Sequence, residues 1–153
     1  MNKLYHFDSE AGLYRSDAAV VWCFDARFTL AVEKFLKRRA IARADSIRVA
    51  GGAKSLASPR EESERGFIVD QLRLSRKLHG AERVILFAHA DCGAYGGLAA
   101  FNGDPVVEAE NHRRELARAS DWVRRAVPDM PVECFFVDFS GVWEVESVRA
   151  AGN

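Results

Sequence analysis

An excess of charge of either sign is missing from this chain of 153 residues, in which 22 lysines and arginines balance 22 aspartates and glutamates. Proteins that bind DNA, RNA or anionic lipid usually carry a basic excess, so this balance argues against nucleic-acid and membrane partners. Long hydrophobic runs are missing too, because none approaches the roughly 18–20 apolar residues that span a bilayer. The first 17 residues hold no apolar segment typical of a signal peptide. We therefore expect a cytoplasmic protein.

Cysteine is scarce, with Cys23, Cys92 and Cys134 as its three occurrences. A small, odd number in a chain without an export signal argues against a disulfide scaffold. Such thiols are either buried and inert or act as metal ligands or nucleophiles, and their neighbours decide which. Cys134 lies in an apolar run that reads as core, so we assign it no chemistry.

Repeats, low-complexity stretches and linkers rich in proline or serine are also absent. The sequence therefore predicts a single domain over residues 1–153, with residues 1–17 as an N-terminal arm. Hydrophobic residue types make up 48% of the chain, which is enough for one sizeable core.

Apolar runs typical of buried strands alternate with segments of helical periodicity. Strands are expected at 18–24, 46–50, 83–88 and 132–139, with an alternating edge strand at 143–148. Helices are expected at 28–43, 59–79, 95–101 and 105–127. This alternation predicts an α/β fold of three layers: a mostly parallel sheet of about four strands plus an antiparallel edge strand, with helices on both faces.

The second of these helices has an expected start and stop. Ser58 is placed to cap its N-terminus, with Pro59 as the first helical residue and Glu61 completing a capping box. Gly80 is expected to end it. In the last helix His112 falls on the apolar stripe, where a core histidine is expected.

Reactive side chains gather where two of the buried strands end. Cys23, Asp25 and Arg27 alternate at the end of the first, and would lie on one side of an extended chain. His89 and Cys92 follow the strand at 83–88. Ligands bind at the carboxyl ends of the strands in such sheets. Two thiols and an imidazole suit Zn²⁺ and leave its fourth position for water, as in catalytic zinc sites.

The remaining groups admit several roles. Asp25 could orient a zinc-bound water or take the fourth metal position itself, and Arg27 could hold that carboxylate by a charge-assisted pair. A Cys92 nucleophile with His89 as its base is an alternative, although it leaves Cys23 and the Asp–Arg pair without a task. Gly51 and Gly52 could cradle an anion with their N–H groups, or simply permit a tight turn.

Four segments resemble, in order, those of the β-class carbonic anhydrases: CFDAR (23–27), RVAGG (48–52), VILFAHADCGAYGG (84–97) and ECFFVDFSGVWEV (133–145). The resemblance implies Cys23, His89 and Cys92 as zinc ligands. It implies Asp25 and Arg27 as the catalytic dyad, with Asp25 a conditional ligand in a closed form. It also implies reversible hydration of CO₂ to bicarbonate by zinc-bound hydroxide, in a homodimer or higher homo-oligomer.

Three departures from this family's pattern bear on function. Val49 stands where asparagine is usual, Ala26 stands where serine or proline is common, and the stretch before the first strand is short. Two other functions therefore stay open: hydrolysis of COS or CS₂ at the same zinc site, and a catalytically silent protein that holds zinc or an anion. Assays on CO₂ and on the sulfur compounds would separate them.

Overall fold

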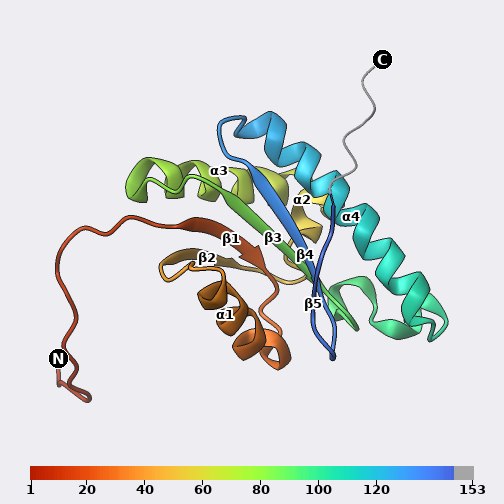
Figure 1. The fold of residues 1–153 in the computed structure, drawn as a ribbon, viewed down its shortest axis with the longest axis horizontal. Coiled ribbons are helices and arrows are strands. Elements are labelled where there is room, and N and C mark those ends of the chain that lie inside the picture. The colour runs from red at the N-terminus through yellow and green to blue at the C-terminus, as the bar shows by residue number, and fades with distance from the viewer. Residues whose placement is uncertain (147–153) are drawn as a thin grey trace.

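Five strands form one sheet in the order β2-β1-β3-β4-β5 (Figure 1). They are β1 (Ala18–Trp22), β2 (Ala44–Arg48), β3 (Val84–His89), β4 (Val132–Val137) and β5 (Val142–Glu144). The first four are parallel, and β5 runs antiparallel to β4. The computed structural model describes residues 1–146. It confirms the predicted sheet of four parallel strands with an antiparallel edge.

Helices cover both faces of this sheet, as expected. They are α1 (Thr29–Arg38), α2 (Lys54–Ala57), α3 (Glu62–His79) and α4 (Pro105–Ala126), with 3₁₀ turns η1 (Ala26–Phe28), η2 (Gly93–Tyr95) and η3 (Leu98–Phe101). The helix α1 lies on one face, while α2, α3 and α4 lie on the other (Figure 1). Residues 1–17 contain no helix or strand and extend from the sheet as an arm.

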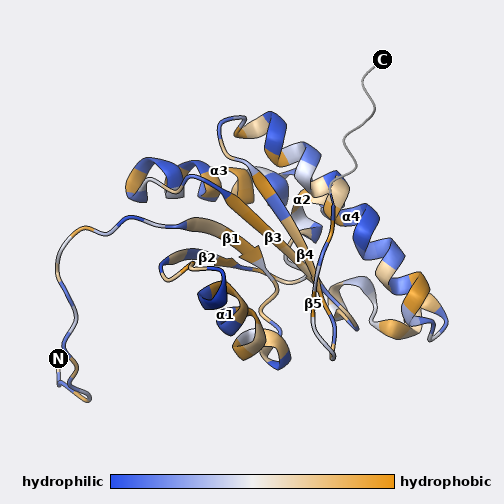
Figure 2. Ribbon diagram, in the orientation of Figure 1, coloured by the Kyte–Doolittle hydropathy of each residue, from blue (hydrophilic) through white to orange (hydrophobic). Residues whose placement is uncertain are grey.

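The two central strands are apolar throughout because both of their faces are covered. In β1, Val20 packs toward α1 and Val21 toward α3 and α4, so alternate residues belong to two separate hydrophobic cores. Every residue of β1 and β3 is buried. Figure 2 shows these strands as hydrophobic ribbons between helices whose outer faces are hydrophilic.

The predicted boundaries of the first helix and of the second strand are wrong. The helix expected at 28–43 ends at Arg38, because Ala40 has a φ of +58° and cannot continue it. The Asp17 carboxylate then accepts hydrogen bonds from the N–H groups of Ala42 and Arg43. The next strand spans 44–48 rather than 46–50. Its register against β1 begins at Ala44, and a turn takes the residues after Arg48.

The expected cap at Ser58 is also wrong. The helix α3 begins at Glu62 with no side-chain cap, and the Ser58 hydroxyl instead donates to the buried Glu115 carboxylate of α4. The short helix α2 that precedes it was not predicted. Gly80 does end α3 in the left-handed conformation, as expected.

Four further segments are shorter than the sequence indicated. The strands at 18–24 and 132–139 end at Trp22 and Val137, and the helix at 95–101 is two 3₁₀ turns broken by glycines. The edge strand covers 142–144 instead of 143–148, of which residues 147 and 148 lie outside the described part of the chain.

His112 is a core histidine, as predicted, and its burial makes the fold sensitive to acid. The side chain is fully buried and neither ring nitrogen has a hydrogen-bond partner. Burial, assisted by the nearby His89, lowers the pKa of His112 to about 4. An unfolded chain binds this proton near pH 6.5, so the folded state loses up to about 3 kcal/mol as pH falls from 6.5 to 4.

We therefore expect His112→Leu to flatten the fall in stability between pH 6.5 and 4. Urea denaturation of the variant and the parent at both pH values measures the difference, and metal loss common to the two proteins cancels. His6→Gln, at an exposed site on the arm, is the matched control. An unchanged acid dependence in His112→Leu would show that His112 is not the group responsible.

Candidate metal centre

Three potential metal ligands meet at the carboxyl ends of β1 and β3. Cys23 directly follows β1, His89 is the last residue of β3, and Cys92 lies three residues farther on. Because these strands are parallel neighbours, their ends coincide. The ligand atoms of the three residues lie within 4.8 Å of one another, and all three side chains are buried.

The state of His89 fits a metal. Its Nδ1 lies 2.8 Å from the carbonyl oxygen of Ala90, which can only accept, so Nδ1 carries the proton. This leaves Nε2 with a free lone pair, and Nε2 is buried without a hydrogen-bond partner. Metal-ligating histidines are usually oriented by such a bond from the other ring nitrogen.

The pKa values of the two neighbouring thiols shift in opposite directions. The hydrogen bond with Cys92 lowers the pKa of Cys23 to about 4 against the opposing effect of burial, and His89 and the Gly51 N–H assist. The Gly51 nitrogen lies 3.4 Å from the Cys23 sulfur. The negative Cys23 and burial raise the pKa of Cys92. A cation would ionise both thiols, and the donor set therefore fits Zn²⁺.

Gly51 and Gly52 let the turn after β2 approach the ligand cluster. A Cβ on Gly52 would lie 2.8 Å from the Phe87 carbonyl oxygen and 2.9 Å from the Cys23 nitrogen, and its φ is +56°. The Gly51 N–H points at the Cys23 sulfur, and the Gly52 N–H donates to the Val49 carbonyl at 3.0 Å. This geometry favours close packing, and an anion-binding role for the two glycines stays a prediction.

Asp25 and Arg27 are paired beside the ligand cluster. The guanidinium binds both carboxylate oxygens, with Nη2 at 2.7 Å from Oδ2 and Nε at 3.1 Å from each oxygen. The Arg27 N–H also donates to Oδ1 at 2.9 Å. These contacts lower the pKa of Asp25 to about 2, so the carboxylate is ionised at any working pH.

Two acidic residues near the centre were missed by sequence reasoning. The Asp91 carboxylate contacts Arg27 at 2.9 Å, and the buried Glu108 accepts a hydrogen bond from the Asp91 N–H at 2.8 Å. The only sequence signal for Asp91 was its place between His89 and Cys92. Glu108 lies on α4 without a motif. Cys134 is buried in β4, away from the cluster of ligand atoms, as expected.

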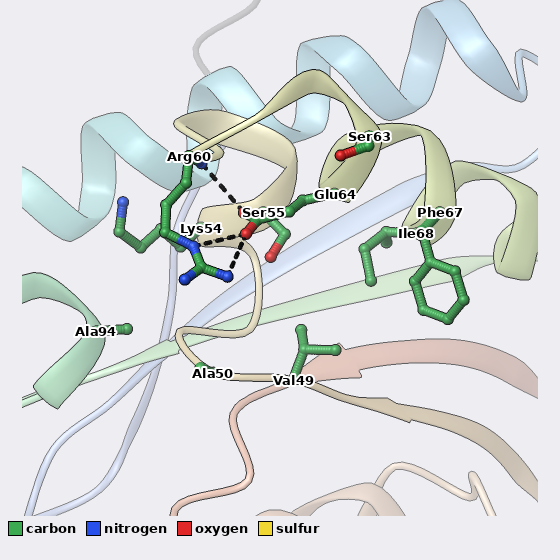
Figure 3. A pocket seen from close by; sticks show the side chains of 10 residues that line it. All are labelled: Val49, Ala50, Lys54, Ser55, Arg60, Ser63, Glu64, Phe67, Ile68 and Ala94. Carbon is green, nitrogen blue, oxygen red and sulfur yellow. Dashed lines mark hydrogen bonds and ion pairs between the residues drawn. The ribbon is translucent and has the colours of Figure 1, made fainter.

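A cavity of about 650 Å³ lies between the turn after β2, the helix α2 and the start of α3 (Figure 3). Its lining includes Val49, Ala50 and Ala94, which adjoin the Gly51 turn and the segment after Cys92. The Val49 side chain points into it, so the departure noted in the sequence lies on the cavity wall. Arg60 and Glu64 form an ion pair at its rim.

The fold and the ligand cluster define an α/β protein with a candidate zinc centre at the carboxyl end of a parallel sheet. The sequence family described as "Putative carbonic anhydrase" matches residues 15–149. The chain belongs to this family. No protein of curated function matches the sequence.

Solved structures share the fold at low sequence identity. A carbonic anhydrase from Streptococcus mutans is 20% identical with a TM-score of 0.58, over 92% of this chain and 89% of the other. The β-carbonic anhydrase isoform I of Trichomonas vaginalis is 15% identical with a TM-score of 0.59, over 92% and 87%. A carbon disulfide hydrolase is 14% identical with a TM-score of 0.56, over 90% and 83%. At these identities the likeness shows the fold.

Proposed function

We propose that the protein catalyses the reversible hydration of CO₂ to bicarbonate, with Zn²⁺ held by Cys23, His89 and Cys92. The observation that carries the proposal is the cluster of three ligand atoms within 4.8 Å beside the Asp25–Arg27 pair. Zn²⁺ with three protein ligands keeps a position for water and lowers the pKa of that water to about 7, which supplies a nucleophile at neutral pH.

The protein's own groups orient and enclose this nucleophile. The ionised Asp25 carboxylate accepts a hydrogen bond from the attacking water and fixes its direction. Arg27 occupies both carboxylate oxygens, which restrains Asp25 from binding the metal itself. Phe28 packs on the His89 ring at a centroid distance of 4.9 Å and is buried, so it shields the imidazole from solvent.

A second candidate is hydrolysis of CS₂ or COS at the same centre. The likeness to a solved carbon disulfide hydrolase favours it, because access to the metal would then decide the substrate. A third candidate, a silent protein that holds zinc or an anion, is suggested by Val49 on the cavity wall.

We also propose a homodimer or a higher homo-oligomer in the cytoplasm. β-Carbonic anhydrases of Sordaria macrospora, which share the fold at 16% identity, are described as tetrameric. Sedimentation at micromolar concentration tests the assembly, and a monomer would count against it. Among residues 1–146, no helix has the length and apolar character needed to cross a membrane.

Purified protein should carry about one zinc per chain. Its CO₂ hydration should rise with pH between about 6 and 9, the range over which a bound Zn²⁺ would ionise its water. Metal analysis with stopped-flow hydration measures both, and parallel assays with COS and CS₂ test the second candidate. A zinc-loaded protein with no hydration above buffer would favour the silent protein, and a flat pH profile would contradict the mechanism.

A further inference from the structure

The guanidinium of Arg27 is held on two edges by two different acidic residues. One edge, Nε with Nη2, binds the Asp25 carboxylate. On the other, Nη1 donates to Asp91 Oδ2 at 2.9 Å and Nη2 donates to the Asp91 carbonyl at 3.0 Å. Bidentate contacts of this kind fix the plane of an arginine as well as its position. Arg27 therefore cannot turn without breaking contacts to Asp91.

Asp91 is itself anchored by the surrounding backbone. Its Oδ1 accepts a hydrogen bond from the Leu98 N–H at 2.9 Å, and its own N–H donates to Glu108 Oε1 at 2.8 Å. Glu108 is 2% exposed, so water does not compete for the hydrogen bond from the Asp91 N–H. Asp91 has a φ of +52°, which turns the chain between His89 and Cys92. Hydrogen bonds therefore fix both the backbone and the carboxylate of Asp91.

Gly97 packs closely against the Asp91 carboxylate, where a side chain would not fit. A Cβ on Gly97 would lie 2.8 Å from Asp91 Oδ1, and Gly97 has a φ of +66°. The rings of Phe28 and Phe139 flank the guanidinium at 5.7 and 5.5 Å from their centroids. Aromatic rings attract a cation but do not fix its rotation. Among the described residues, Asp91 is the second acidic partner that orients Arg27.

We infer that Asp91 is a positioning residue, which holds Arg27 so that Arg27 in turn keeps Asp25 off the metal position. The inference rests on the proposed function and adds a residue to it. A guanidinium bound on both edges is a fixed anchor for Asp25. A guanidinium bound to Asp25 alone can move together with that carboxylate, which then competes with exogenous ligands for the metal.

Asp91→Asn tests the inference with a change of one atom. Asparagine tolerates a positive φ and can still accept the Leu98 hydrogen bond, but it then presents an NH₂ group to Arg27 instead of an oxygen. In protein loaded with Co²⁺, we expect azide to bind about three- to tenfold more weakly, as followed by visible absorption, given a partly exposed ion pair. The kcat for CO₂ should fall by a similar factor with zinc content unchanged.

Asp70→Asn is the matched control, because Asp70 pairs with Arg73 on the exposed side of α3 at 3.2 Å. It should leave azide binding and hydration unchanged. If Asp91→Asn unfolds, Asp91→Gly removes the same carboxylate and adopts the positive φ freely. Azide affinity within twofold of the parent in the folded variant would overturn the inference.

The double variant Asp25→Asn/Asp91→Asn separates positioning from a general structural effect. An amide at position 25 is a poor metal ligand, so the second change should then have no effect on azide affinity. Independent, additive losses would overturn the inference. A parent protein that binds Co²⁺ and azide but does not hydrate CO₂ would refute the proposed function alone, whereas failure to bind Co²⁺ would refute both.

Discussion

Cys92→Ser is expected to lose zinc and, with it, CO₂ hydration down to the background rate. A serine hydroxyl is a poor substitute for a thiolate, and three protein ligands are the usual set for a catalytic zinc. We expect affinity to fall by more than about 10²-fold, since loss of an outer-shell partner alone costs 10–100-fold. Metal analysis after dialysis against a mild chelator measures the loss.

Cys134→Ser supplies the matched control for this experiment. Its sulfur is buried in β4 and contacts the Leu116 carbonyl oxygen at 3.8 Å, away from the three ligand atoms. The same change of sulfur to oxygen should there keep the full zinc content. Full zinc occupancy in Cys92→Ser would show that the ligand assignment is wrong.

The sequence was sufficient for the sheet and for the three ligand candidates because both depend on local patterns. β1 and β3 are apolar on both faces, which indicates central parallel strands without any knowledge of their partners. The carboxyl ends of parallel strands lie at one edge of a sheet, so the sequence predicts that Cys23 and His89 share that edge. The sheet order, in which β1 and β3 are neighbours, then brings them into one cluster.

Contacts between distant segments were beyond sequence reasoning. Asp91 lies 64 positions from Arg27, and Ser58 lies 57 positions from Glu115. A capping pattern around Ser58 is a valid local preference, but a buried carboxylate on another helix competes for the same hydroxyl. Local patterns indicate which groups can pair, and only the packed fold decides which of them are paired.

Substitutions of Asp25 and Arg27 are expected to have the second large effect on CO₂ hydration. They also distinguish an enzyme from a protein that only binds zinc. Arg27→Ala should retain zinc and lose about 10²-fold or more in kcat, since Asp25 is then free to occupy the metal position. Asp25→Ala should also retain zinc, while its loss of hydration reflects an unoriented water. Stopped-flow hydration with metal analysis measures both variants, and Arg73→Ala on α3 is the control for removal of a paired arginine.

The double variant Asp25→Ala/Arg27→Ala decides whether the two residues act as one unit. If Arg27 acts only through Asp25, its removal costs nothing more once that carboxylate is absent, and the combined loss is far smaller than the product of the single losses. The salt bridge of 2.7 Å and the fully ionised Asp25 favour this outcome. Near-parental hydration in both single variants would make the pair structural and refute the mechanism, whatever metal the protein holds.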